Sequence, residues 1–250
     1  MPEAGKKHKS YKRPPIIEAV IEVRFANSLD DKKLEKLVSK QKSKFTIQTL
    51  QKVEFRIPLN EEAGVTAEAK TEFAGYKLIN NVDSSIIVQI KRDAISFSKL
   101  PPYEGWPKLV TEFKKFYDWY TNKNFKSLSR IGIRYINRID IPAAGQNIEL
   151  EDYLKIYPQV PKKKFPVFNS YSTQIVSDIE CDRVLTVNVR GADEPPLLNF
   201  ESIIFDIDIA QSKNLPNNNP QLFKVLEEIR NKKNFFFEDL LTPKCKRLFN

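Results

Sequence analysis

The stretch Ser129–Pro142, SRIGIRYINRIDIP, is the clearest guide to the fold because apolar and polar residues alternate along it. A period of two is typical of a β-strand with one face on a core. The residues expected on the core face are Ile131, Ile133, Tyr135, Asn137, Ile139 and Ile141. Those expected on the opposite face are Arg130, Gly132, Arg134, Ile136, Arg138 and Asp140. The strongly apolar face predicts that this strand lies in the middle of a sheet.

The segments on both sides of this strand predict further strands and a few helices. Strands are expected at Ile16–Phe25, Phe45–Pro58, Gly75–Asn80, Ser85–Phe97 (bent at Arg92-Asp93), Tyr171–Glu180, Arg183–Arg190 and Phe200–Ile209. Helices are expected after a Ser28/Asp31 capping pair, over Glu104–Tyr120, over Glu149–Tyr157, after Asn217–Pro220 and from Thr242-Pro243. This order predicts an α+β fold, a curved, mainly antiparallel sheet packed against amphipathic helices.

The domain organisation follows from the same pattern. Residues 1–13 form a flexible basic tail, residues 14–145 a first α+β unit and residues 146–250 a second one. In both units antiparallel strands are followed by a long helix. This shared order leaves open that the chain consists of two similar halves, packed together as one compact body.

The composition argues against most familiar enzyme classes. The 250 residues include one His (His8), two Cys and seven Gly, and they contain no GxGxxG, Walker A, HExxH, GxSxG or CxxC pattern. Histidine is the usual proton shuttle near neutral pH, and glycine-rich turns usually hold phosphates. We therefore favour a binding protein over an enzyme and expect no catalytic residue, no cofactor and no metal.

The arginines of the Ser129–Pro142 strand have two interpretations. Arg130, Arg134 and Arg138 recur every fourth residue and would form a basic row suited to phosphates or carboxylates. Alternatively they form cross-strand ion pairs with acidic residues of neighbouring strands. The candidate partners are Glu18, Glu22, Asp206 and Asp208. We favour the ion pairs, because opposite charges at matching spacing need no ligand.

Two weaker constellations were weighed against structural explanations. Asp178, Glu180, Asp206 and Asp208 supply the carboxylates of a Mg²⁺-dependent nuclease, but Asp-x-Asp is common and no lysine stands at a matching spacing. The aromatic residues of Glu104–Tyr120 follow helical spacing with lysines on the other side, which is typical of core packing.

The charge distribution leaves nucleic-acid binding open. The net charge is +9, and much of it comes from residues 1–13 and Lys32–Arg56. Lys36, Lys40 and Lys44 are the candidate polyanion contacts in the second stretch. No apolar run is long enough for a membrane span, the first residues do not resemble a secretory signal, and the two cysteines form no disulfide pattern. We expect a cytoplasmic protein with no membrane association.

Three segments resemble a known family. RPPIIEAVIEVRF (Arg13–Phe25), RIGIRYINRIDIP (Arg130–Pro142) and FFFEDLLTPKCKRLF (Phe235–Phe249) are similar to the opening, middle and closing motifs of uncharacterised, sporadically distributed bacterial and archaeal proteins of this length. The resemblance implies no established activity. A patchy distribution is typical of the genes of mobile defence or toxin–antitoxin loci. This similarity is an association and gives no mechanism.

These observations give three functional hypotheses. The preferred one is a non-enzymatic binding or assembly protein that acts through a protein partner or self-association. The alternative is a nucleic-acid-binding protein that uses Lys36, Lys40, Lys44 and the arginine row. The third is a pocket for a small anionic ligand between the sheet and the Glu104–Tyr120 helix, lined by aromatic residues and reached by a strand arginine.

Overall fold

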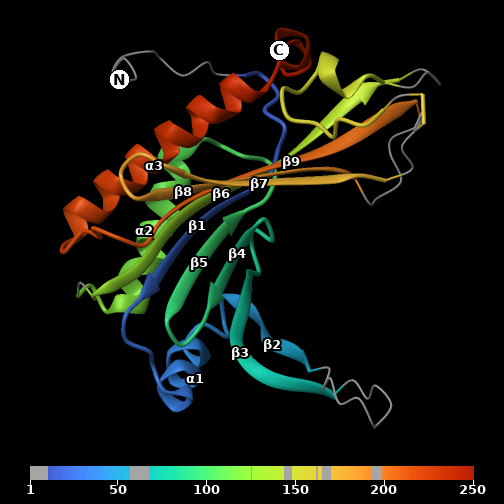
Figure 1. Ribbon diagram of the computed structural model, residues 1–250. Coiled ribbons are helices and arrows are strands. Elements are labelled where there is room, and N and C mark those ends of the chain that lie inside the picture. Colours follow the sequence, from blue (N-terminus) through green and yellow to red (C-terminus); the bar gives the residue numbers. More distant parts are fainter. Residues whose placement is uncertain are drawn as a thin grey trace, which may run out of the picture.

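The computed structural model describes residues 11–56, 68–124, 126–143, 148–161, 163–164, 170–192 and 199–250 (Figure 1). The strands are β1 (Ile16–Phe25), β2 (Phe45–Arg56), β3 (Glu68–Asn80), β4 (Ile86–Ile90), β5 (Ala94–Lys99), β6 (Leu128–Pro142), β7 (Ser172–Ile179), β8 (Arg183–Gly191) and β9 (Phe200–Gln211). The helices are α1 (Asp31–Ser39), α2 (Trp106–Thr121), α3 (Asn219–Leu240) and α4 (Pro243–Arg247), with a 3-10 turn at Leu150–Asp152.

The nine strands form one open antiparallel sheet in the order β2-β3-β4-β5-β1-β6-β9-β8-β7, which confirms the predicted α+β fold. β6 lies inside the sheet, as its alternation predicts, and pairs with β1 on one side and with β9 on the other. The boundary predicted near residue 145 falls between β6 and β9, so strands of both predicted units join the same sheet. Whether the units are related halves stays a prediction.

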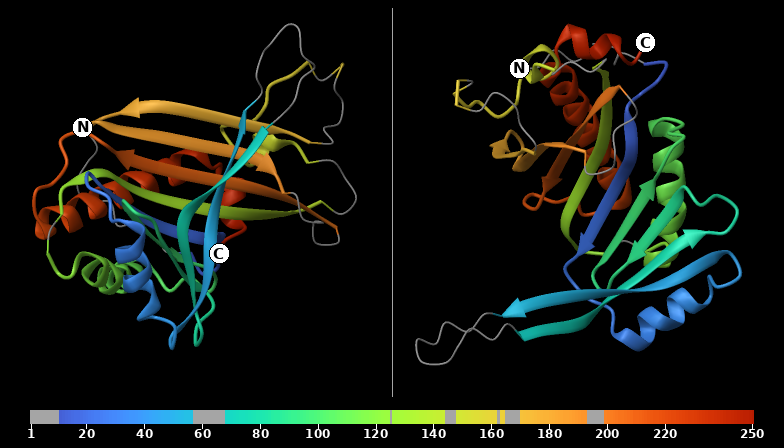
Figure 2. Two further views of the ribbon diagram at one scale, coloured as in Figure 1. Left: turned by 90° about the horizontal axis from the view of Figure 1, so that it is seen from below. Right: turned by 90° about the vertical axis from the view of Figure 1, so that its right-hand side faces the viewer.

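The two faces of the sheet differ in what covers them. α2 and α3 lie on the same side, as the views in Figures 1 and 2 agree. The side chains facing these helices are apolar and fully buried, for example Ile21, Phe97 and Ile133. The opposite face is polar, and none of the described helices covers it. Burial of the apolar face against α2 and α3 is the main favourable term holding the sheet and helices together.

The predicted start of α1 is wrong by two residues. The N-cap is Asp30, whose Oδ1 accepts the backbone N–H of Lys33 at 2.8 Å, and Ser28 does not cap the helix. The reason lies in the preceding residue. The backbone N–H of Leu29 donates to the carbonyl of Arg92 at 2.7 Å, which ties this segment to the β4–β5 turn. A helix therefore begins only after that bond.

The segment Ser85–Phe97 is two strands and not one bent strand. β4 and β5 pair antiparallel, and the backbone N–H of Lys91 donates to the carbonyl of Ala94 at 2.9 Å to close the turn between them. The strand predicted at Gly75–Asn80 is longer and begins at Glu68.

The helix predicted over Glu149–Tyr157 is only the 3-10 turn Leu150–Asp152. It ends there because Leu154 forms a bridge with Leu241 and the backbone N–H of Lys155 donates to the carbonyl of Leu240 at 2.9 Å. Chain pairing at this point prevents another helical turn.

The two termini of the described chain lie beside each other (Figure 1). The backbone N–H of Arg13 donates to the carbonyl of Phe249 at 2.9 Å, and the ring of Tyr11 contacts the ring of Phe249 edge-on. Most of the tail predicted at residues 1–13 lies outside the described residues. Over the part of the chain that the structure describes, no helix has both the length and the apolar character needed to cross a membrane.

Candidate functional site

The arginine row of β6 is paired with carboxylates across the sheet, as the ion-pair interpretation predicts. Arg130 Nη1 lies 2.6 Å from Glu22 Oε1 of β1, and Arg130 Nη2 lies 2.9 Å from Asp208 Oδ2 of β9. Arg138 Nε donates to Asp140 Oδ1 at 2.8 Å on its own strand. Each pair lies on the face that no described helix covers.

Arg134 makes the most regular of these contacts. Its Nε and Nη2 donate to the two oxygens of Asp206 at 2.9 and 2.7 Å, the bidentate geometry that suits a guanidinium. The carboxylate of Asp206 is only 5% exposed, but the Arg134 side chain is 50% exposed and therefore less buried than the sequence suggests. The contact with Asp206 raises the pKa of Arg134 above its ordinary value.

The polar face is balanced in charge. A shallow hollow of about 480 Å³ lies between β1, β6 and β8, and its acidic and basic lining residues are equal in number. They are Glu18, Glu22, Arg24, Arg130, Arg134 and Asp208. Burial raises the pKa of Asp208, and the positive charges of Arg130 and Arg134 partly oppose this rise. Since the guanidinium groups are already satisfied by carboxylates, this face offers little free positive charge to an anion.

The predicted lysine contacts lie elsewhere. Lys36 is in α1, Lys40 is its C-cap and Lys44 directly precedes β2, so the three lie near the β2 edge of the sheet. All three are exposed. The structure does not bring them together with Arg130, Arg134 and Arg138 into a single surface, because α1 packs beside β2 and β3, several strands away from β6 (Figure 1).

Three of the four carboxylates considered for a metal site form other contacts. Asp206 and Asp208 pair with arginines, and Glu180 Oε1 accepts from Lys232 Nζ at 2.5 Å. Among the described residues, no group of three or more His, Cys, Asp or Glu side chains is placed to hold a metal ion.

A second polar cluster couples a serine to a lysine in the β3–β4 turn. The buried Lys99 ammonium donates to Ser85 Oγ and, at 2.8 Å, to Asp83 Oδ2. These hydrogen bonds lower the pKa of Asp83 to about 2, so the carboxylate stays ionised and pairs with Lys99. An ammonium cannot accept the serine proton, so this cluster stabilises the turn and has no features of a nucleophile with its base.

A cavity of about 440 Å³ lies on the helix side, between the sheet, the start of α2 and the second half of α3. We call it the lysine pocket. Tyr135 and Asn137 of β6 form its floor, and Tyr103 and Trp106 form one wall. The remaining wall comes from the residues that lead into β1 and from α3. They include Tyr11, Pro14, Pro15, Lys233 and Phe237.

Lys233 gives the pocket its chemistry. It follows Leu222, Leu226 and Ile229 on the buried stripe of α3, and it is only 6% exposed. Its Nζ lies 3.6 Å from the centre of the Tyr135 ring. No hydrogen-bond acceptor or carboxylate of the described chain lies within bonding distance of this nitrogen. A lysine so deeply buried without an anionic partner is uncommon, since burying an unpaired charge is costly.

The surroundings of Lys233 act on its protonation in opposite directions. Burial and, to a smaller extent, the nearby guanidinium of Arg230 lower the pKa of Lys233 to about 7, while Glu238 acts in the opposite direction. The electron-rich face of the Tyr135 ring also favours the ammonium form. The amine is therefore present in both charged and neutral forms near neutral pH.

Tyr103 and Tyr135 together provide a second hydrogen-bond donor inside the pocket. The hydroxyl oxygens of Tyr103 and Tyr135 lie 2.7 Å apart, so one of them donates to the other. The second hydroxyl proton has no acceptor among the described residues. Burial raises the pKa of both phenols, which therefore stay protonated at neutral pH.

The acidic residues at the pocket are already engaged. Glu238 accepts from the Tyr11 hydroxyl at 2.7 Å, and Glu104 accepts from Lys108 at 2.6 Å. Glu227, beside the pocket, accepts from the indole N–H of Trp106 and lies 3.3 Å from Arg230. The other charged groups that line the cavity are Lys12 and Arg230. The pocket thus contains two donors without a partner among the described residues, Lys233 Nζ and one tyrosine hydroxyl, beside carboxylates that are bonded to other groups.

The sequence analysis predicts an aromatic pocket near α2 but not its main residue. The polar group that reaches the pocket is Lys233 of α3, not an arginine of the β6 strand, whose arginines point to the other face. The available signal was the position of Lys233 itself, because a lysine on the apolar stripe of a helix departs from the amphipathic pattern.

The three segments that carry the family resemblance meet at this pocket. Arg13–Phe25 supplies Pro14 and Pro15, Arg130–Pro142 supplies Tyr135, and Phe235–Phe249 supplies Phe237. Comparison of the whole chain with protein-family models and with curated protein sequences finds no match. The resemblance itself therefore stays a prediction.

Proposed function

We propose that the protein binds a small organic acid with an aromatic ring in the lysine pocket. The observation that carries the proposal is Lys233, a buried cation that faces a cavity of about 440 Å³ without an anionic partner in the described chain. A ligand carboxylate would supply the missing charge and the missing acceptor.

The shape and lining of the cavity support this class of ligand. Its volume lies in the range of about 300 to 1,000 Å³ that small-molecule sites occupy. Tyr103, Trp106 and Phe237 give it aromatic walls, which suit a ring packed edge-on or offset. The free hydroxyl proton of the tyrosine pair adds one donor for a second ligand oxygen. A cavity with aromatic walls and a few convergent donors is a usual form of a small-molecule site.

Thermal unfolding with a matched pair of compounds tests the proposal. We expect phenyllactate to raise the melting temperature, because a ligand that binds only the folded state stabilises it. The same molecule with the carboxylate reduced to an alcohol, 3-phenylpropane-1,2-diol, should have no effect. Lys233→Met should abolish the shift.

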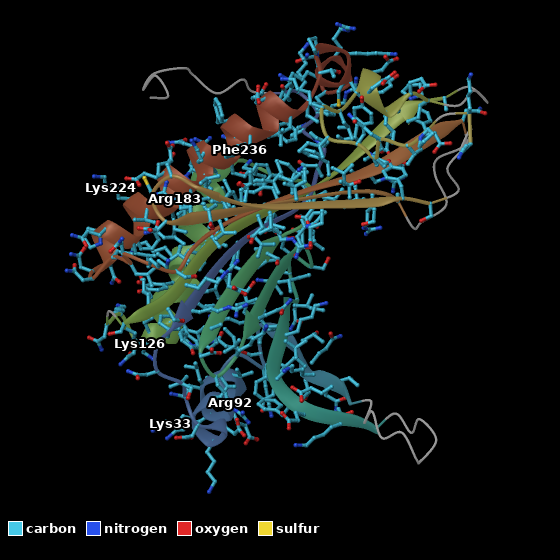
Figure 3. The ribbon with its side chains drawn as sticks, viewed as in Figure 1. Lys33, Arg92, Lys126, Arg183, Lys224 and Phe236 are labelled. Carbon is cyan, nitrogen blue, oxygen red and sulfur yellow. The ribbon has the colours of Figure 1, made fainter. Side chains whose placement is uncertain are left out.

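The control variant is Lys224→Met, which removes an exposed lysine of the same helix (Figure 3) and should keep the full shift. Equal stabilisation by the acid and the diol would contradict the proposal, as would an unchanged shift in Lys233→Met.

The protein partner and the nucleic acid stay predictions from the sequence. The pairing of the β6 arginines leaves Lys36, Lys40 and Lys44 as the main candidates for phosphate contact. Affinity for generic DNA or RNA that falls steeply with salt would support that alternative. Light scattering of the purified chain would report self-association.

A further inference from the structure

The lysine pocket places a buried amine next to a phenol hydroxyl. Lys233 Nζ sits over the face of the Tyr135 ring at 3.6 Å from its centre, and the hydroxyl of that ring is paired with Tyr103. The amine has no hydrogen-bond partner in the described chain, and it faces the cavity. A lysine that is desolvated and close to a second cation, here Arg230, is the usual form of an amine nucleophile.

We propose that Lys233 forms a Schiff base with the carbonyl carbon of an aromatic 2-oxo acid bound in this pocket. The inference rests on the proposed function, since it takes the carboxylate as the group that is recognised. In a 2-oxo acid the carboxylate is attached directly to the carbonyl carbon. An ion pair between this carboxylate and the cations of the pocket therefore leaves the carbonyl carbon within reach of the same amine.

The bond changes balance without an added oxidant or reductant. The lone pair of the neutral Lys233 amine attacks the carbonyl carbon, a C–N bond forms and the C=O π electrons move to oxygen. A proton passes from nitrogen to that oxygen and gives a carbinolamine. The C–O bond then breaks as the C=N bond forms, and the oxygen leaves as water with one amine hydrogen and one proton donated by the Tyr103–Tyr135 pair. The nitrogen keeps its second hydrogen as an iminium, and the phenolate takes a proton back from solvent.

The pocket has a group suited to each stage. In the protein without ligand the pKa of Lys233 is about 7, so a substantial fraction of the amine meets the 2-oxo acid in its neutral, nucleophilic form. In that encounter the carboxylate pairs with Arg230 or Lys12, the other cations that line the cavity. The free hydroxyl proton of the Tyr103–Tyr135 pair can be donated to the oxygen that leaves. The iminium formed is a cation, so the neighbouring carboxylate of the ligand stabilises it as it would the ammonium.

Borohydride trapping on the whole protein tests the inference. Phenylpyruvate and phenyllactate share ring, chain and carboxylate, and only phenylpyruvate has a carbonyl. We expect phenylpyruvate with borohydride to add one reduced ligand per chain, found by peptide mapping on Lys233. Phenyllactate should raise the melting temperature without any mass gain, and in excess it should suppress the adduct of phenylpyruvate. Lys224→Met should be labelled as wild type, and Lys233→Met should lose the adduct.

The outcomes separate this inference from the proposed function. If both acids stabilise the protein but phenylpyruvate leaves no adduct, the Schiff base is excluded and acid binding stands. An adduct spread over exposed lysines and insensitive to phenyllactate also overturns the inference. If neither acid stabilises the protein, the proposed function fails and the inference fails with it.

Discussion

Replacing Lys233 with methionine should make the protein more stable, and the gain should depend on pH. Methionine has a similar length and fills the same space without a charge. A fall in pKa from the ordinary 10.5 to about 7 corresponds to about 5 kcal/mol against the buried ammonium. We therefore expect Lys233→Met to be about 5 kcal/mol more stable than wild type at pH 6.

The sign of the pH dependence follows from proton binding. Between about pH 7 and the ordinary pKa near 10.5, the unfolded chain keeps the proton that folded Lys233 has released. Wild-type stability therefore rises with pH across this window relative to the variant. The advantage of Lys233→Met should be complete below pH 7 and should fall to roughly 1 kcal/mol by pH 9.5. The charged groups facing Lys233 that the variant keeps are Arg230 and Glu238.

Urea unfolding of both proteins at pH 6 and pH 9.5 measures this difference. Lys224→Met removes an exposed lysine of the same helix, so its stability should stay within about 0.5 kcal/mol of wild type at both pH values. A wild type as stable as Lys233→Met at pH 6 would refute the argument, because it would mean that the ammonium has a compensating partner. An advantage that does not change with pH would also refute it, because the gain would then come from packing.

Three further predictions concern the sheet and the floor of the pocket. Arg134→Ala should lower stability by about 1 to 2 kcal/mol, because it leaves the buried Asp206 carboxylate without its bidentate partner. The loss is limited because half of the arginine side chain is exposed. An unchanged urea midpoint would instead favour an anion-binding role. Gly75→Ala should cost more than about 2 kcal/mol, because its φ is +140° and an added Cβ would meet the carbonyl oxygen of Ile90 at 2.3 Å; a wild-type melting temperature would contradict the strained geometry. Tyr135→Phe should weaken phenyllactate binding by roughly five- to tenfold, the equivalent of about one hydrogen bond, and calorimetric titration giving wild-type affinity would exclude the phenol from the site.

Strand alternation and helical spacing predicted most of the fold. The two faces of β6, and the acidic partners of its arginines, could be named from the alternation of one strand and the charges of its neighbours. What failed depended on contacts distant in sequence. The start of α1 was misplaced because Leu29 is held by Arg92, and the helix at 149–157 stops because Leu154 pairs with Leu241.

The candidate site was predicted only in outline. The third functional hypothesis placed an aromatic pocket against α2, but the lysine of the pocket lies on α3, about 110 residues beyond the end of α2. Lys233 stands at the same helical spacing as Leu226, Ile229 and Phe237, so its burial was readable from the sequence. Its lack of an anionic partner could not be predicted, because it depends on tertiary contacts of the nearby carboxylates. Glu238 accepts a hydrogen bond from Tyr11, and Glu227 accepts one from Trp106.

Titration of Lys233 itself shows whether the side chain is a buried amine without an anionic partner. NMR of lysine labelled at the ε-carbon follows the protonation of Lys233, whose signal is identified by its loss in Lys233→Met. In the free protein we expect a pKa of about 7, and saturating phenyllactate should raise it toward the ordinary 10.5 because the carboxylate stabilises the ammonium. A pKa near 10.5 in the free protein, or one that phenyllactate does not move, would contradict the account.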